Sequence, residues 1–194
     1  VASFHGNGYV RERAITLLAE IRDGRELPYL LIRANDWVSQ VRSAAQEAIQ
    51  ARLIPEYAGH FVTNLPLVER LLRSERADYG GLVQSIFVLL QKPEARAVLH
   101  AGFTAANRQV RRLSYRLAVT APGEDVSLVL TRALHERDPI IRTWAAQQAA
   151  AVLDQEALQS AVSMMAHDPS MPVRRMALQI TVEHFPAIAH DMLL

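Results

Sequence analysis

A short pattern recurs along this chain: a valine or isoleucine, then an arginine, and a small residue four positions after the apolar one. The steps between successive arginines are 31, 69, 31 and 32 residues, so the long step leaves room for one degenerate copy. Self-similarity with a period of roughly 20–50 residues indicates an array of stacked repeats. The five clear copies begin at Val10-Arg11, Val41-Arg42, Val110-Arg111, Ile141-Arg142 and Val173-Arg174.

Each copy lies near the start of a predicted helix, because its apolar residues return at the i, i+3/i+4, i+7 spacing of a helix face. Asn, Asp or Pro precedes each copy, as expected for an N-cap and a first helical turn. The small residues Ala45, Ala145 and Ala177 should be buried where two helices approach closely. Shorter partner helices are predicted at 27–34, 65–73, 94–101, 125–136 and 155–167, with a partial one at 187–194.

The segments DWVSQVRSAA, DPIIRTWAA and DPSMPVRRMA resemble the HEAT family, in the short bacterial form also seen in the phycobilisome-lyase type. The segments NGYVRERA and NRQVRRLS match the same pattern in part. This resemblance covers nearly the whole chain. It implies an all-α fold: a right-handed α-α superhelix of the HEAT/ARM-like solenoid kind, with about six helical hairpins in one domain over residues 1–194.

Residues 52–106 depart from the pattern, so we expect one irregular repeat there. Pro55, Gly59 and Pro66 interrupt what would be one helix and leave an extra segment around 56–63. The degenerate copy is predicted at 82–90, with bulky Phe87 at the close-packing position. Neither end of the chain resembles the polar cap of a solenoid, and we therefore expect either a section of a longer chain or an end that pairs with another molecule.

Composition argues against several kinds of site. The chain has no cysteine, which excludes disulfides and thiolate ligands. Its seven histidines include one His-Glu pair, His135-Glu136, whereas HEAT-fold deoxyhypusine hydroxylases need several such pairs for their di-iron site. We therefore predict no metal, no cofactor, no catalytic residue and no enzymatic activity. No apolar run is long enough to span a bilayer, so a cytoplasmic protein without membrane contact is expected.

Polar side chains that point away from the partner helices could bind a ligand in the concave groove of a solenoid. In the C-terminal copies this face should be basic and rich in amides, which suits an acidic or phosphate-bearing protein or peptide. The predicted partner-binding residues are Arg112, Tyr115, Arg116, Gln147, Arg175 and Gln179. By contrast, the turn acids and Val-Arg arginines are expected to satisfy helix ends: Asp36, Arg42, Arg111, Asp138, Arg142, Asp168 and Arg174.

The sequence thus favours a non-enzymatic protein-binding scaffold or adaptor that uses its concave face. The alternative is a nucleic-acid-binding or DNA-repair protein similar to the HEAT-like alkylpurine glycosylases, which use concave Trp, Asp and Arg residues. Trp37, Trp144 and Asp36 would suit that comparison, as would Asp138 and Arg142. A formal net charge of +1 argues against it, because phosphate contacts dominate DNA affinity. The partner's identity and the oligomeric state stay open.

Overall fold

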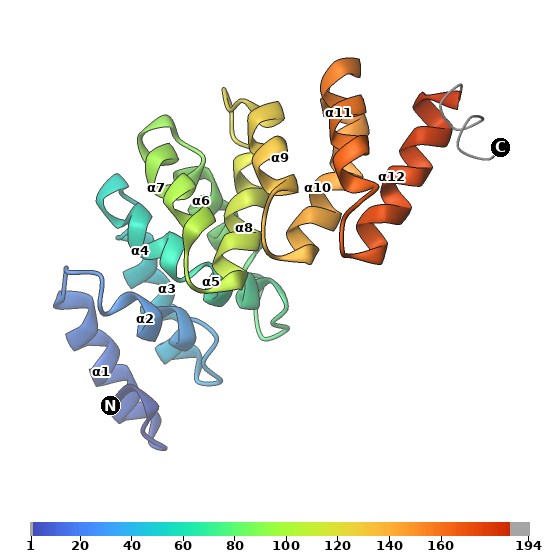
Figure 1. Cartoon of the computed structure of the whole chain (residues 1–194). Coiled ribbons are helices and arrows are strands. Elements are labelled where there is room, and N and C mark those ends of the chain that lie inside the picture. Colours follow the sequence, from blue (N-terminus) through green and yellow to red (C-terminus); the bar gives the residue numbers. More distant parts are fainter. Residues whose placement is uncertain (1, 187–194) are drawn as a thin grey trace. The chain divides into compact units, whose positions relative to one another are not determined.

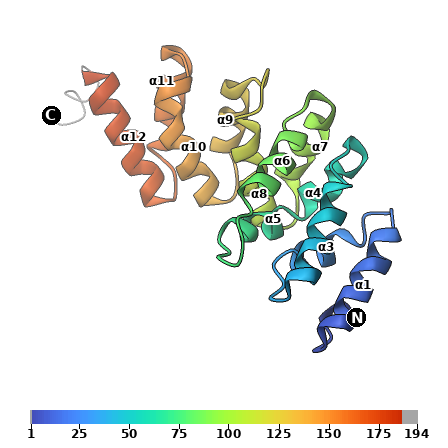
Figure 2. The same ribbon diagram turned by 180° about the vertical axis from the view of Figure 1, so that it is seen from behind.

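All regular elements in the described residues, 2–186, are helices in the computed structural model, and no strand occurs among them (Figure 1, and from behind in Figure 2). The all-α prediction is confirmed. The chain divides into two units, Val1–Pro122 and Gly123–Leu194. The partial helix predicted at 187–194 lies outside the described residues.

The first unit contains helical hairpins built from α-helices and short 3-10 helices. Helix α1 packs against α3, α2 against α3, and α7 against α8. The α-helices are α1 (Gly8–Glu20), α2 (Leu27–Arg33), α3 (Ser39–Gln50), α4 (Ala58–Thr63), α5 (Leu65–Leu72), α6 (Gly80–Leu90), α7 (Arg96–Ala101) and α8 (Arg108–Ala118). The 3-10 helices are η1 (Ala2–Phe4), η2 (Pro55–Tyr57), η3 (Pro93–Ala95) and η4 (Gly102–Thr104).

The second unit contains α9 (Val126–Leu134), α10 (Pro139–Val152), α11 (Gln155–Met165) and α12 (Met171–His184). Helix α10 packs against both α9 and α12, and α11 packs against α12. Across both units, no helix within residues 2–186 has the length and apolar character needed to cross a membrane.

The repeated sequence pattern forms a repeated turn. In all five copies an Asn or Asp side chain accepts a hydrogen bond from the backbone N–H two residues later, as Asn7 does from Tyr9. The arginine of each copy then donates to the carbonyl six residues before it, as Arg42 does to Asp36. The first contact satisfies a backbone N–H that the helix leaves free at its start, and the second binds a carbonyl of the turn before the helix. The structural role predicted for these residues is confirmed.

Two of these arginines also join successive copies through bidentate ion pairs. Arg11 donates from Nε and Nη2 to both oxygens of Asp36, at 2.9 Å each. Arg142 binds Asp168 in the same way, at 2.7 and 2.8 Å. The hydrogen bonds from Arg142 hold the pKa of Asp168 below its ordinary value. Burial disfavours the charged form of Asp36, but hydrogen bonds from Arg11 and the backbone outweigh it, so its pKa is lowered as well.

These two aspartates give the unfolding free energy a dependence on pH. Their pKa values are lower in the folded chain than the ordinary 3.8, so the pairs stabilise the fold above that value. The stabilisation should be lost as the pH falls from about 4 toward the folded-state pKa values. Urea unfolding between about pH 7 and pH 3 should show this decline, and Asp36→Asn should show less of it and lower stability at neutral pH. A stability that rises below about pH 4 would contradict this account.

The small residues of the repeat lie at the helix contacts, as predicted. Ala45 and Ala145 are fully buried, and Ala177 is 1% exposed. Because α10 packs against helices on two sides, Ala145→Leu should lower the unfolding free energy by about 1–3 kcal/mol through overpacking. Chemical denaturation of this variant measures the effect. Gln148→Leu, on the exposed face of the same helix, is the control and should stay within about 0.5 kcal/mol of the original chain.

The interrupted segment forms two short helices, α4 and α5, where other copies have one partner helix. Helix α6 follows at the position of the degenerate copy. The expectation that Phe87 fills the close-packing position is wrong: Phe87 is half-exposed, whereas Ile86 is fully buried. Helix α6 buries the face of Val83, Ile86 and Leu90, since it packs on α4 and α5 rather than on one partner helix.

A buried ion pair lies beside this interruption. Arg52 Nε donates to Glu26 Oε1 at 2.6 Å, and both side chains are fully buried. The Tyr57 hydroxyl donates to the same oxygen at 2.7 Å. Arg52 also donates to the backbone carbonyls of Leu18, Ala19 and Ile21, which end α1. One arginine therefore connects the end of α1, the start of α2 and η2.

Candidate functional site: an arginine-lined pocket

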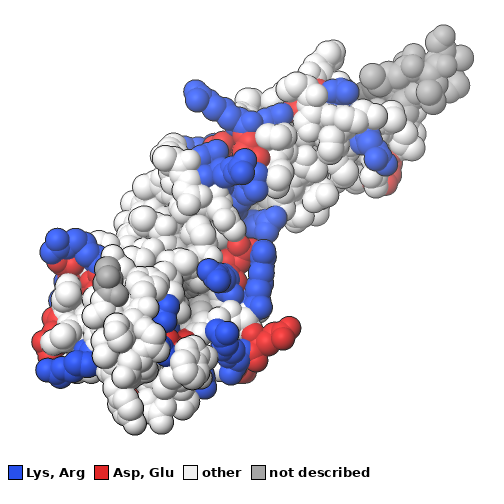
Figure 3. Space-filling model, turned by 90° about the horizontal axis from the view of Figure 1, so that it is seen from below, with Lys and Arg blue, Asp and Glu red and all other residues white. Residues whose placement is uncertain are grey.

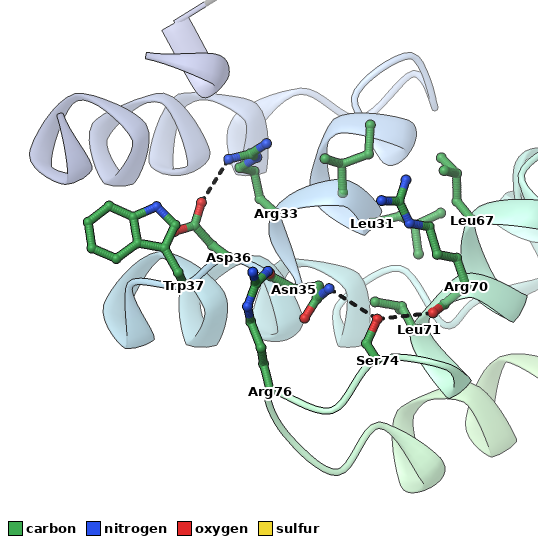
Figure 4. A pocket seen from close by; sticks show the side chains of 11 residues that line it. Leu31, Arg33, Asn35, Asp36, Trp37, Leu67, Arg70, Leu71, Ser74 and Arg76 are labelled. Carbon is green, nitrogen blue, oxygen red and sulfur yellow. Dashed lines mark hydrogen bonds and ion pairs between the residues drawn. The ribbon is translucent and has the colours of Figure 1, made fainter. Parts of the chain in front are cut away.

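A pocket of about 240 Å³ lies between α2 and α5 in the first unit, where the repeat is interrupted (Figure 4). Its walls come from the end of α2, from α5, and from the turns that follow these helices. Three of its side chains are arginines and one is an aspartate. The lining residues are Leu31, Ile32, Arg33, Asn35, Asp36, Trp37, Leu67, Arg70, Leu71, Ser74 and Arg76.

The aspartate of the pocket is saturated by its own neighbours. Asp36 Oδ2 accepts from Arg11 Nε and from Arg33 Nη1 at 2.8 Å. Asp36 Oδ1 accepts from Arg11 Nη2 and from the Val38 N–H. Since Asp36 is shared between Arg11 and Arg33, these three side chains keep one net positive charge, and no acid pairs with Arg70 or Arg76 within residues 2–186.

The opposite wall is a chain of hydrogen bonds between the turn after α2 and the turn after α5. Asn35 Nδ2 donates to Ser74 Oγ at 3.0 Å, and the Tyr79 hydroxyl donates to Asn35 Oδ1 at 2.9 Å. Burial raises the pKa of Tyr79, so this hydroxyl stays protonated as a donor. Arg76 Nη1 donates to the Asn35 carbonyl at 3.0 Å. These contacts fix the turn after α5 against the turn after α2.

The pocket arginines retain unused donors. The Arg70 side chain is exposed in the last turn of α5 and has no hydrogen-bond or ion-pair partner within residues 2–186. Arg33 Nε is buried and likewise has no acceptor in that part of the chain. Because Arg33 Nε is buried, the donors open to a ligand are those of exposed Arg70 and Arg76. The arrangement suits an anionic group with several oxygens.

Trp37 adds an aromatic wall. Its side chain is 68% exposed, although large apolar side chains are usually covered. Its ring is nonetheless held in place, because the Arg11 guanidinium lies over it at 5.1 Å from the ring centroid. Buried Leu31 and Leu71 lie across the pocket in Figure 4. The pocket therefore offers apolar contact next to the cations.

The position predicted for one of the binding residues is wrong. Tyr115 was expected in an exposed groove, but it is fully buried and stacks on Phe103 with ring centroids 4.0 Å apart. The equivalent positions of two other copies, Ile15 and Ala146, are also fully buried. The reason for the burial of Tyr115 is that α8 packs against α5, α7 and the 3-10 helix η4, which carries Phe103.

The other predicted residues fall in two places. Gln147, Arg175 and Gln179 line one open hollow of about 470 Å³ on α10 and α12 of the second unit, and Gln179 Nε2 donates to Glu183 at 2.9 Å. In the first unit, Arg116 is exposed on α8, and Arg112 is half-buried there. The structure thus brings three of the six residues together.

Sequence reasoning missed the arginine pocket itself. Arg33, Arg70 and Arg76 belong to no repeated motif, and only Asp36 and Trp37 had been considered, for the nucleic-acid alternative. The available signal was the interruption of the repeat. The turn before α6 does carry Asp78, which accepts from the Gly80 N–H as the other turn acids do. It lies 36 positions after Arg42, however, and no ion pair joins the two within residues 2–186, while Asn35, Ser74 and Tyr79 make other contacts there.

The described residues contain no group of three or more His, Asp or Glu side chains that could hold a metal ion. The single His-Glu pair of the sequence lies after α9, where His135 Nδ1 is 2.8 Å from the carbonyl of Thr131.

No protein-family model matches this sequence, and neither does any curated protein. Among solved structures, one that is similar is human deoxyhypusine hydroxylase in complex with glycerol. The two share 18% sequence identity, with a TM-score of 0.40, over 96% of this chain and 82% of that one. At this level the likeness concerns the helical fold only.

This comparison corrects the expectation that the chain has no enzymatic activity. The similar structure is an enzyme by its name, so a helical-repeat fold gives no ground for excluding catalysis. The likeness does not transfer that enzyme's activity to this chain either.

Proposed function

We propose that this chain is a HEAT-like repeat protein that binds an acidic segment of a partner protein, with the arginine pocket as the main contact. The observation that best supports this proposal is the positive charge of the pocket. Arg33, Arg70 and Arg76 line it, and the oxygens of its one aspartate already accept hydrogen bonds from Arg11 and Arg33. Arginine binds carboxylate and phosphate groups through two parallel hydrogen bonds, which gives direction as well as attraction. A scaffold or adaptor role follows from such a contact.

The distribution of charge favours a protein partner over a nucleic acid. The formal net charge is only +1. On the face shown in Figure 3, basic and acidic side chains are intermingled. A nucleic acid would need a run of cations that follows its phosphates, whereas a mosaic of charges suits a protein surface.

The hollow of the second unit is a candidate for additional contacts with the same kind of partner. Gln147 and Gln179 offer amide donors and acceptors, and Arg175 a cation, beside the exposed apolar side chains of Leu178 and Val182. Arg112 and Arg116 on α8 are proposed as contacts of the first unit. These residues were predicted from the sequence, without Tyr115.

The proposal is tested with the whole chain and fluorescent degenerate peptides, one library rich in Asp and Glu and one rich in Lys and Arg. Fluorescence anisotropy should show binding of the acidic library, and Arg70→Glu should weaken it by about tenfold or more. Arg13→Glu is the matched control: Arg13 is exposed on a helix of the same unit and has no side-chain partner within residues 2–186. Equal binding of both libraries, or equal loss in both variants, would refute the proposal.

A further inference from the structure

The charge of the arginine pocket exceeds what one carboxylate would neutralise. Three lining arginines and one aspartate give a formal charge of 3 − 1 = +2. Arg11 does not line the pocket, but it donates to both oxygens of Asp36 and adds a further positive charge. A side-chain carboxylate carries one negative charge, whereas a phosphorylated side chain carries about −1.5 to −2 at neutral pH.

The free donors also outnumber the oxygens of a carboxylate. Arg70 has its whole guanidinium group available among the described residues. Arg33 has a buried Nε and one nitrogen engaged, with Asp36, and Arg76 has one nitrogen engaged, with the Asn35 carbonyl. These donors come from α2, from α5 and from the turn after α5, so they approach the pocket from different sides (Figure 4). A phosphate group offers three acceptor oxygens in a pyramidal arrangement, which matches donors from several directions.

The apolar side chains at the rim of the pocket indicate which kind of group lies beside the bound anion. Exposed Trp37 and the partly exposed side chain of Leu67 offer apolar contact at the rim. A metabolite made mainly of phosphate would leave this surface uncovered. A peptide would cover it with the residues on either side of its anionic side chain.

We propose, resting on the function proposed above, that the arginine pocket recognises a phosphorylated side chain of the partner peptide. Arg70 makes the principal contact, Arg33 and Arg76 bind the remaining oxygens, and Trp37 packs on a neighbouring residue. Binding to the partner is then controlled by the kinase and phosphatase that act on it.

The test uses three degenerate peptide libraries that differ only at one fixed central residue: phosphoserine, glutamate or serine. With the whole chain at physiological salt, the phosphoserine library should bind about tenfold more tightly than the glutamate library, because charge-assisted hydrogen bonds are added. The serine library should bind more weakly than both. Arg70→Glu should remove the preference for phosphoserine, and Arg13→Glu should keep it.

The outcomes separate the two proposals. If the glutamate library binds as tightly as the phosphoserine library and Arg70→Glu weakens both, the phosphate inference fails and the acidic-partner function stands. If no library binds, both fail. A single-stranded oligonucleotide is included as a further probe, and tighter, Arg70-dependent binding of it than of phosphoserine peptides would overturn the inference in favour of a nucleic acid.

Discussion

Arg52→Met should lower the unfolding free energy by about 3–5 kcal/mol, the largest effect on stability that we expect from one substitution. Arg52 and Glu26 are fully buried, so removal of the guanidinium leaves a carboxylate charged inside the protein. The same change frees the carbonyls of Leu18, Ala19 and Ile21 at the end of α1. Urea unfolding measures the loss, and hydrogen exchange should show it first in α1.

Two further variants show whether the buried charge is the cause. In Arg52→Met/Glu26→Gln no charge is left uncompensated, and a glutamine oxygen can still accept from Tyr57, so the double variant should be more stable than Arg52→Met alone. Arg22→Met is the control, because Arg22 is exposed and makes one long contact, 3.4 Å, to the Ala51 carbonyl. A loss in Arg22→Met equal to that in Arg52→Met would contradict the role given to burial.

The pH dependence offers an independent check. Burial disfavours the charged form of Glu26, but hydrogen bonds from Arg52 and Tyr57 outweigh it and keep its pKa below the ordinary 4.5. Without Arg52, burial should raise this pKa instead. Lower pH would then neutralise the isolated carboxylate, so the destabilisation by Arg52→Met should shrink as the pH falls.

Arg70→Glu/Arg76→Glu should have the largest effect on binding, with a loss of affinity for the phosphoserine library of about a hundredfold or more. Arg70 is exposed and has no partner within residues 2–186, so Arg70→Glu should change the unfolding free energy by no more than about 0.5 kcal/mol. Arg76→Glu also removes the hydrogen bond to the Asn35 carbonyl and should lower this free energy by about 0.5–1.5 kcal/mol. Each substitution replaces a donor with a repelling carboxylate. Fluorescence anisotropy at two salt concentrations measures the loss, which should be greater at low salt.

The double variant Arg112→Glu/Arg116→Glu has the same change in charge and tests the groove predicted from the sequence. It should weaken binding less than the pocket variant does, while helicity stays unchanged. If instead it abolishes binding and the pocket variant retains it, α8 carries the main contact. Melting temperatures accompany both measurements, because Arg112 is half-buried.

The helices were predictable because their signals are local. The hydrogen bond from Tyr9 to Asn7 spans two residues, and that from Arg42 to Asp36 spans six, so both follow from the order of residues in one turn. The burial of Ala45 follows from helical spacing in the same way. Repetition strengthened the prediction of these helices, since five copies of the pattern gave the same result.

The pocket and the buried pair depend instead on residues distant in sequence. Tyr79 meets Asn35 across 44 positions, and Arg52 meets Glu26 across 26, at places where the repeat gives no guide. The position of Tyr115 was predicted wrongly for a related reason: helical spacing identifies the face of α8 toward a partner helix but not the further face that η4 covers with Phe103. To predict such contacts, one must know how three elements of the fold are arranged relative to one another.

The bidentate pairs of Arg11 with Asp36 and of Arg142 with Asp168 have a consequence for changes in chain length. They join residues 25 and 26 positions apart, so these two junctions between copies have the same chemistry. A genetic duplication of the segment from Asp138 to His167 would place a new Arg–Asp pair at the added junction. No acid pairs with Arg42 in the described part of the chain, so a duplication or loss there would leave mismatched ends. A whole copy should therefore be gained more readily at the Arg142–Asp168 junction than within the interrupted segment.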